Sequence, residues 1–193
     1  MPRIQTATLA AHRDWRRSQL IEAAAAIALE SGGQAVTVAA VAQRAGLSRT
    51  SIYEYFASSA ELVADLITEE MKAFTKLLDS AVAQATDCED AIHRWIEVSL
   101  RYIADGNHLL AKSLNATELP RNRAQQIGAA HRLMLVPLHS NLEKLGVKDC
   151  SQALALLQAA TDVATKRIES GSDADAEIQK TTAFCIAGIK ALI

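Results

Sequence analysis

Apolar residues recur at three- and four-residue spacing along almost the whole chain, and polar residues fill the positions between them. Glycine, proline and capping residues interrupt this pattern and mark helix ends. The pattern therefore predicts an all-α protein of about nine helices. Their expected ranges are residues 15–31, 38–45, 48–56, 58–85, 87–104, 107–116, 120–145, 149–170 and 173–192. Pro137 should kink the seventh of these helices, because proline removes a backbone donor in mid-course.

Residues 37–56 form the most informative segment, two short amphipathic helices joined by a glycine turn. Thr37 is expected to cap the first helix, and Gly46 to end it in a left-handed conformation. Ser48 is expected to cap the second helix, from which Ile52 and Phe56 face inward. This arrangement predicts a helix-turn-helix whose second helix enters the major groove of DNA. A plain helical hairpin has the same spacing and is the alternative reading.

The inward direction of Ile52 and Phe56 leaves the other side chains of the second helix free to contact DNA. Arg49 is the strongest candidate for reading guanine, since its guanidinium can donate two bonds to O6 and N7. Thr37 and Tyr55 are expected to anchor to the phosphate backbone. The predicted DNA-binding residues are Arg16, Thr37, Ser48, Arg49, Thr50, Ser51, Tyr53 and Tyr55.

Charge is divided unevenly along the chain. Residues 1–57 carry six arginines and four acidic residues, whereas the remainder carries 14 basic and 18 acidic residues. A protein that contacts a polyanion with one end only would show this division, with modest non-specific affinity. The densest basic cluster is His12, Arg13, Arg16 and Arg17, at the start of the first helix. Trp15, next to it, is expected to pack as a lid on the three-helix core.

These motifs together resemble the DNA-binding head of the TetR family of transcriptional regulators. The resemblance covers residues 15–66, about a quarter of the chain. It is carried by the alanine-rich first helix, Thr37-Val38, Ala45-Gly46-Leu47-Ser48 and Tyr53-Glu54-Tyr55-Phe56. The family usually places a lysine in a Ser-Lys-x-x-Leu stretch, where this chain has Ser59, so a phosphate contact should be weaker here.

The last two helices predict a homodimer. Apolar or small residues occupy most of their circumference, and a surface this apolar would be buried by pairing with a second subunit as a four-helix bundle. The TetR resemblance implies the same. The predicted dimerisation residues are Leu157, Thr161, Ile178, Thr182, Cys185 and Ile189. A two-fold dimer presents two recognition helices about 34 Å apart, or a multiple of that distance, and so requires a palindromic operator in double-stranded DNA.

The middle helices could enclose a small-molecule effector, whose identity the sequence does not give. Apolar side chains with a few polar groups are typical of such pockets. The predicted ligand-binding residues are Trp95, Ser99, Tyr102, Leu114, Met134 and Leu138. Each of them also fits a role in the plain helical core.

Other chemistry finds no support in the sequence. The chain lacks a nucleophile-elbow motif, a phosphate-binding glycine loop and a zinc-protease motif, so we expect no catalytic residues, no metal and no cofactor. The three cysteines are far apart and are expected to be packing thiols. No apolar run reaches the length of a membrane span and no secretory pattern begins the chain, which predicts a cytoplasmic protein without membrane contact.

The sequence therefore predicts a helix-turn-helix domain over residues 1–57, with a short N-terminal arm, and an effector-binding and dimerisation domain over residues 58–193. The expected function is a transcriptional repressor that a small molecule releases from its operator. One alternative is a dimer of the same fold that no longer binds DNA and acts as a ligand-binding or protein-interaction module. A helical enzyme that uses the body pocket is a second alternative.

Overall fold

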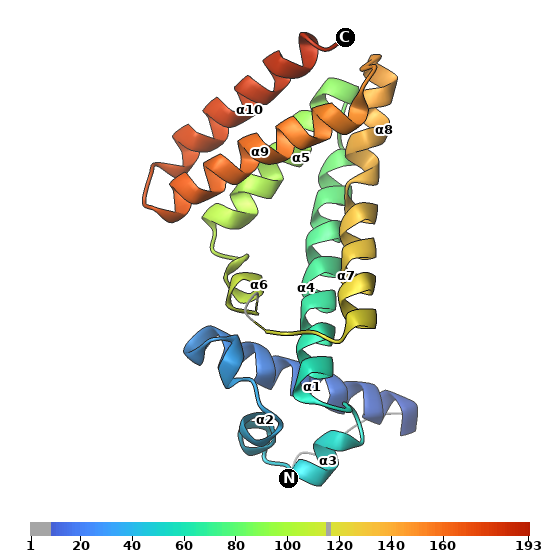
Figure 1. Ribbon diagram of the computed structural model, residues 1–193, viewed down its shortest axis with the longest axis vertical. Coiled ribbons are helices and arrows are strands. Elements are labelled where there is room, and N and C mark those ends of the chain that lie inside the picture. The colour runs from blue at the N-terminus through green and yellow to red at the C-terminus, as the bar shows by residue number, and fades with distance from the viewer. Residues whose placement is uncertain (1–8, 115–116) are drawn as a thin grey trace. The chain divides into compact units, whose positions relative to one another are not determined.

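The computed structural model describes residues 9–114 and 117–193, with side chains from residue 11 onward. The first eight residues of the predicted N-terminal arm and the predicted end of the sixth helix at residue 116 lie outside the described residues. Within the described ranges every regular element is helical, which confirms the all-α prediction (Figure 1). The elements are α1 (Leu9–Ser31), η1 (Gly33–Ala35), α2 (Val38–Ala45), α3 (Arg49–Tyr53), α4 (Ser59–Val82), α5 (Cys88–Ala104), α6 (Leu109–Leu114), α7 (Arg121–Met134), α8 (Val136–Leu145), α9 (Cys150–Glu169) and α10 (Ala174–Lys190).

The chain divides into two compact units, Met1–Glu70 with Leu109–Gly128, and Met71–His108 with Ala129–Ile193. We call the first the head and the second the body. The predicted boundary after residue 57 differs from this division. The start of α4 and all of α6 belong to the head because their apolar side chains, including Leu62, Leu66 and Leu110, complete its core. Both α4 and α7 continue from the head into the body.

The head packs α1, α2, α3, α6 and the first turns of α4 around one apolar core. The predicted inward face of α1 is confirmed, since Leu20 and Ala24 are completely buried. Gly33 lies against the backbone of α6, where an added Cβ would come within 2.5 Å of the Ser113 carbonyl oxygen. Glycine is the one residue that fits this contact without displacing α6.

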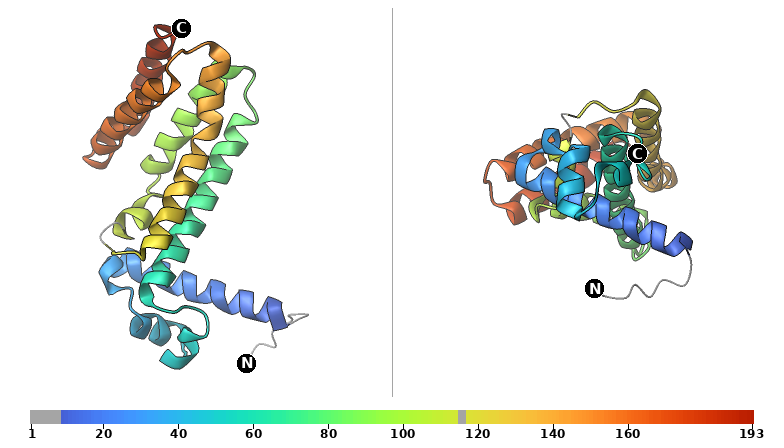
Figure 2. Two further views of the ribbon diagram at one scale, coloured as in Figure 1. Left: turned by 45° about the vertical axis from the view of Figure 1, so that its right-hand side comes forward. Right: turned by 90° about the horizontal axis from the view of Figure 1, so that it is seen from below.

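The body packs α5, α8, α9 and α10 around a second core. α9 and α10 lie side by side and cover α5, as Figures 1 and 2 show. Trp95, Ile96 and Leu100 of α5 meet Leu138 of α8 and Ile189 of α10 in this core. Cys185 is also buried there, and its burial raises the pKa of the thiol to about 11, so it stays protonated at neutral pH.

Two details differ from the sequence prediction. α1 begins at Leu9 instead of residue 15, and Trp15 is 41% exposed on its surface, so the expected role of Trp15 as a core lid is wrong. The helix expected to kink at Pro137 is interrupted, with α7 ending at Met134 and α8 beginning at Val136. Proline favours this break because it lacks the N–H group that would continue the hydrogen bonding of α7, and it is tolerated in the first turn of α8.

An ion pair fastens α9 to α10 across the turn that joins them. Arg167 donates from Nε to Glu177 Oε2 at 2.8 Å and from Nη2 to Oε1 at 2.7 Å. Glu177 is mostly buried, and these hydrogen bonds from Arg167 hold the pKa of its carboxyl below the ordinary value of 4.5. The ionised form of Glu177 is therefore favoured in the folded protein.

We expect Glu177→Gln to lower the thermal stability at neutral pH. Because the folded-state pKa of Glu177 is lowered, its contribution is complete above the unfolded value and is lost as the pH falls through the folded value. The difference in Tm between the variant and the natural protein should therefore shrink as the pH falls below 4.5. Circular dichroism melts over a pH series measure this. Asp162→Asn, at an exposed acid of α9, is the matched control, and a pH-independent difference for Glu177→Gln would contradict the assignment.

Candidate nucleic-acid interface

The turn between α2 and α3 has the geometry of a helix-turn-helix. Thr37 Oγ1 accepts a hydrogen bond from the Ala40 amide at 3.1 Å and caps α2. Gly46 takes a left-handed conformation, with φ 66° and ψ 32°, and ends that helix. Ser48 Oγ accepts from the Ser51 amide at 3.1 Å and caps α3. The three local signals in the sequence thus form the turn that they predict.

The recognition helix α3 turns its apolar side chains inward and its polar side chains outward. Ile52 is completely buried and Phe56, just after the helix, is 2% exposed. Arg49, Thr50 and Tyr53 are exposed. Ser48 is exposed as well, and Ser51 and Tyr55 are partly exposed. The Ser48 and Ser51 hydroxyl groups lie 2.9 Å apart. All the residues predicted from α3 and its cap are therefore at least partly exposed.

The arginines of α1 take separate roles. The Arg16 guanidinium lies 5.2 Å from the centroid of the exposed Trp15 ring, which keeps it at the surface. Arg13 donates from Nη2 to the Glu54 carbonyl oxygen at 3.3 Å, and Arg17 forms an ion pair with Asp65 at 2.5 Å. The basic cluster is thus partly engaged within the protein, which the sequence analysis missed. The four-residue spacing of Arg13 and Arg17 is the signal that these two side chains share one helix face.

The predicted ligand-binding residues lie in different parts of the molecule. Trp95, Ser99, Met134 and Leu138 are buried in the body. Leu114 instead belongs to the core of the head, so its grouping with the others is wrong. The partly buried Tyr102 contacts Phe74, with ring centroids 4.4 Å apart.

Some buried polar atoms of the body form hydrogen bonds within the protein and others do not. Ser99 Oγ donates to the Trp95 carbonyl oxygen at 2.7 Å, which occupies its hydroxyl hydrogen. Trp95 Nε1 and His108 Nδ1 are buried without a hydrogen-bond partner in the structure. A buried donor of this kind is costly unless something accepts its hydrogen. Trp95 is therefore the predicted ligand residue whose chemistry best fits a bound molecule.

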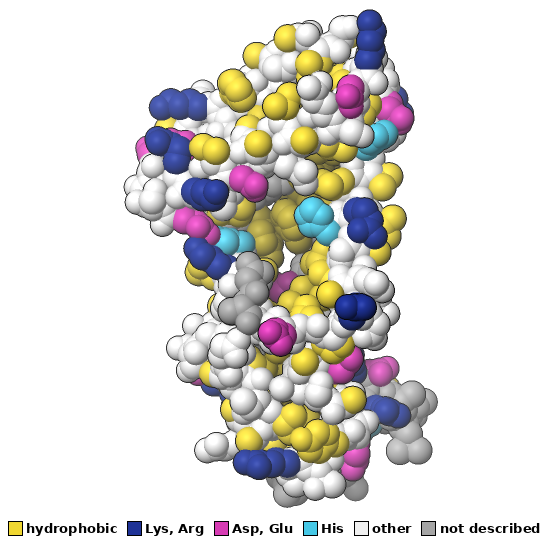
Figure 3. Space-filling view, viewed as in Figure 1, with side chains coloured by type: hydrophobic (Ala, Val, Ile, Leu, Met, Phe, Trp, Pro, Cys, Tyr) yellow, Lys and Arg dark blue, Asp and Glu magenta, His cyan; other side chains and the backbone are white. Residues whose placement is uncertain are grey.

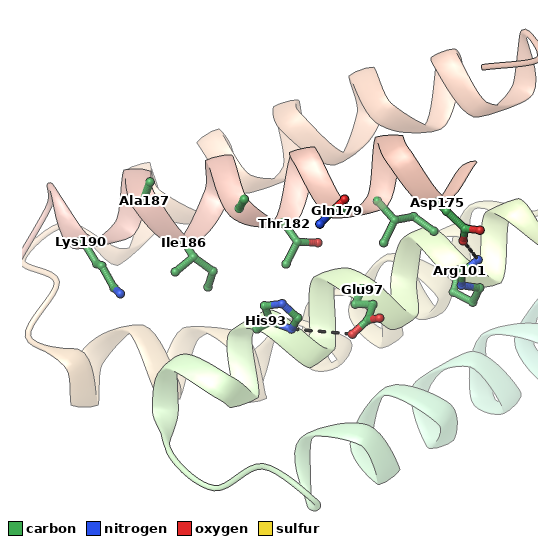
Figure 4. A pocket seen from close by; sticks show the side chains of 11 residues that line it. His93, Glu97, Arg101, Asp175, Gln179, Thr182, Ile186, Ala187 and Lys190 are labelled. Atoms are coloured by element: carbon green, nitrogen blue, oxygen red, sulfur yellow. Dashed lines mark hydrogen bonds and ion pairs between the residues drawn. The ribbon is translucent and has the colours of Figure 1, made fainter. Parts of the chain in front are cut away.

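A groove of about 690 Å³ lies elsewhere in the body, between α5 and α10 (Figure 4). Arg101 and Asp175 pair across one end of it at 2.6 Å, and His93 lies 3.7 Å from Glu97 further along α5. The predicted ligand-binding residues do not line this groove. Its rim carries both signs of charge, so it has no clear preference for an anionic or a cationic ligand.

Most of the predicted dimerisation residues are buried within their own subunit. Five of the six are buried in the core of their own subunit, and Thr161 is partly buried, with its hydroxyl donating to the Gln158 carbonyl oxygen at 2.9 Å. The five buried residues are Leu157, Ile178, Thr182, Cys185 and Ile189. Their inward direction is set by packing on α5.

A different set of apolar side chains is exposed on α9 and α10. Leu156 is 56% exposed, Val163 58% and Phe184 69%. With Ala160 and Gly188 they line a groove of about 380 Å³, which we call the α9–α10 face. Three of the predicted dimerisation residues, Leu157, Cys185 and Ile189, also line this groove. Figure 3 shows hydrophobic side chains spread over these two helices. Exposed apolar surface of this kind is typical of an interface.

Other sites receive no support from the described part of the chain. Among the described residues no three His, Cys, Asp or Glu side chains come together as a metal site. The helices in the described ranges include none that is both long and apolar enough to cross a membrane.

Residues 20–66 match the family model described as bacterial regulatory proteins, tetR family. A curated relative, the HTH-type transcriptional activator FasR of Mycolicibacterium smegmatis, is 28% identical over 116 residues, which are 58% of this chain and 52% of the relative. The chain thus spans about half the length of that relative. The matched family segment contains α2, α3 and all the predicted DNA-binding residues except Arg16.

Two solved structures show the same fold. The transcriptional regulator FadR from Bacillus subtilis, in complex with stearoyl-CoA, has a TM-score of 0.73 and 21% identity, and the match covers 89% of this chain and 98% of that one. The superantigen PfiT has a TM-score of 0.76 and 17% identity, with 88% and 95% covered. These similarities establish that the chain has the all-α fold of TetR-like regulators.

We expect Ser48→Ala to destabilise the head, because the Ser51 amide then loses its partner. The cost of losing such a cap is about 1 kcal/mol. Urea unfolding followed by circular dichroism measures it. Ser48→Asn is the matched control, since asparagine caps helices as well as serine does. Equal stability of the alanine and asparagine variants would show that the cap does not stabilise α3.

Proposed function

This chain belongs, through residues 20–66, to the TetR family of bacterial regulators, and we propose that it is a sequence-specific transcriptional regulator controlled by a small molecule. The observation that carries the proposal is the capped helix α3, which turns Arg49, Thr50 and Tyr53 outward from a rigid core. A regulator of this kind acts in the cytoplasm, where its DNA lies. In this proposal the protein represses transcription while it is bound to its operator, and the small molecule releases it. Loss of operator binding when the effector is added tests this.

In the proposed complex, α3 enters the major groove, and its side chains contact either base edges or the sugar-phosphate backbone. Arg49 reads a guanine through two hydrogen bonds, and Ser48, Thr50 and Ser51 lie beside it at the groove. Tyr53 and Tyr55 hold the sugar-phosphate backbone. Thr37 does the same from the start of α2, and the stacked Arg16 adds a positive charge from α1.

The proposed dimer forms through the α9–α10 face. Leu156, Val163 and Phe184 are too exposed for core residues, and a second copy of the same face would bury them in a four-helix arrangement. A two-fold dimer requires an operator with inverted repeats, because each head reads one half-site. The dimer therefore explains both the apolar surface and the expected symmetry of the DNA.

The proposed effector is an apolar compound with a hydrogen-bond acceptor. Apolar side chains surround Trp95 in the body, and its buried Nε1 lacks an acceptor. The structurally similar FadR of Bacillus subtilis is in complex with stearoyl-CoA, which supports long-chain acyl compounds as the first class to test. Effector binding would favour one arrangement of the two heads over another and so change operator affinity.

One observation favours the alternative in which the fold no longer binds DNA. Ser59 stands where TetR-like proteins usually place a lysine, so one phosphate contact loses its charge. A gel-shift titration on random and upstream duplexes at several salt concentrations separates the two readings. Affinity that falls steeply with salt supports DNA binding, whereas no shift at low salt supports the protein-interaction module.

We expect Arg49→Ala and Tyr53→Phe to weaken DNA binding in different ways. Arg49→Ala should remove about 1–3 kcal/mol of discrimination at one operator position. Tyr53→Phe should weaken operator and unrelated duplex alike, because a phosphate contact carries no sequence information. The measurement is selection of sequences from a random DNA pool, followed by titration of each variant on the selected operator and on its point variants. Equal loss on operator and random duplex for both variants would refute the division.

We expect Phe184→Glu to convert the dimer to a monomer and to weaken operator binding strongly. A buried carboxylate without a partner is costly, and two copies of it would repel across a two-fold axis. Light scattering coupled to size exclusion measures the mass. Leu133→Glu, at an equally exposed side chain of α7, is the matched control and should stay dimeric. Loss of the dimer in both variants, or in neither, would contradict the proposed interface.

A further inference from the structure

Four charged side chains from three helices meet within the head. Asp65 of α4 binds Arg17 of α1 through Oδ2, at 2.5 Å, and Arg123 of α7 through Oδ1. Arg123 Nε also lies 3.4 Å from Glu61 Oε2, one turn earlier on α4. Asp65 and Arg123 are only 20% and 19% exposed. We call this group the Asp65 joint.

The charges of the Asp65 joint balance only when both arginines are present. Glu61 and Asp65 are four residues apart on α4, where two like charges face each other and destabilise a helix. Arg123 contacts both carboxylates, and Arg17 contacts Asp65 alone. If Arg123 withdrew, two carboxylates would share a single cation in a partly desolvated place. Leaving a mostly buried charge uncompensated is far more costly than losing an exposed pair.

The same arginine of α1 contacts the end of the recognition helix. Arg17 Cζ lies 5.6 Å from the centroid of the Phe56 ring, and Phe56 is buried directly after α3. One turn earlier, Arg13 donates to the Glu54 carbonyl oxygen and lies 6.0 Å from the Tyr55 ring centroid. α1 thus holds the carboxyl end of α3 through two arginines, and one of them is held in turn by Asp65.

The length of α3 makes these contacts important. The helix has five residues, far fewer than a helix needs to be stable alone in water. Its orientation is therefore decided by what its two ends contact. The amino end is fixed by the turn at Gly46, and the carboxyl end by Ile52, Phe56 and the arginines of α1.

We infer that the Asp65 joint positions the recognition helix and that Arg123 links α7 to it. This inference rests on the proposed function, since it assigns a role within DNA recognition. Arg17 and Arg123 are positioning residues, which act on DNA only through α3. α7 continues from the head into the body, so a displacement of its first turn changes the Arg123 contacts and, through Asp65 and Arg17, the support of Phe56. By linkage, DNA that selects one orientation of α3 also selects one state of this contact.

The test compares Arg123→Gln with Arg123→Lys, and uses Arg121→Gln as the matched control at an exposed arginine of the same helix. We expect Arg123→Gln to lower the affinity for the selected operator about tenfold, because a residue that acts on a binding site through other residues changes its affinity by about this much. Its affinity for unrelated duplex should fall less than its affinity for the operator, and the slope of operator binding against salt should stay unchanged. Arg123→Lys should restore part of the loss. Arg121→Gln should bind both duplexes as the natural protein does.

A second measurement needs no DNA. Tyr55 and Phe56 donate their amides to the Ile52 carbonyl oxygen at 2.9 and 3.0 Å, so their hydrogen exchange reports the end of α3. Exchange of both amides should be about tenfold faster in Arg123→Gln than in Arg121→Gln, while the amides in the middle of α9 stay protected alike.

The outcomes separate failure of the joint from failure of the proposed function. Unchanged operator affinity and unchanged exchange in Arg123→Gln would overturn the joint. Parallel loss on operator and unrelated duplex, with a smaller salt slope, would instead make Arg123 a direct phosphate contact and would also overturn it. If the natural protein bound no duplex, the proposed function would fail, and the exchange result would still support or overturn the positioning of α3.

Discussion

The orientation of α3 depends on the burial of Ile52 and Phe56, and the proposed recognition of DNA depends on that orientation. A helix of five residues gains little from its own hydrogen bonds. Burying two large apolar side chains in the core of the head supplies about 1.5–3 kcal/mol each, which is enough to hold the helix in place. Because the two side chains are four residues apart, fixing them leaves the opposite side of the helix, with Arg49, Thr50 and Tyr53, as the surface that faces outward.

The features that could be predicted from the sequence are those that neighbouring residues determine. The cap at Thr37, the left-handed Gly46 and the cap at Ser48 each act within three residues, so local sequence is sufficient to recognise them. Partner choice over long separations has no such local signal. Arg13 and Glu54 are 41 residues apart, and Asp65 and Arg123 are 58 apart. Periodicity shows which helix face such residues share, and only the packed structure shows what lies opposite.

The terminal helices show a second limit of periodicity. α9 and α10 are apolar around most of their circumference, so each has two faces that can be buried. In the structure one face, with Leu157 and Cys185, packs inside the subunit, and the other, with Phe184, remains exposed. Hydrophobic spacing identifies both faces, but it does not show which one is buried within the subunit. The contacts of α9 and α10 with α5, which is distant in sequence, determine which face is buried within the subunit. The exposed face is then the one left for a partner.

The Asp65 joint differs from the apolar contacts around it in how it responds to a small displacement. An apolar contact is non-directional and loses stabilisation gradually as its surface area falls. The contact of a carboxylate with two arginines depends on direction and distance. Arg123 also contacts both acidic side chains, Glu61 and Asp65 of α4, which repel each other when this cation leaves. Such a group has a favourable arrangement with Arg123 in place and a much less favourable one without it. This group lies where α1, α4 and α7 meet. Among the described contacts, the charged side chains at the carboxyl end of α3 come from α1, so a change in how Asp65 holds Arg17 changes the support of α3.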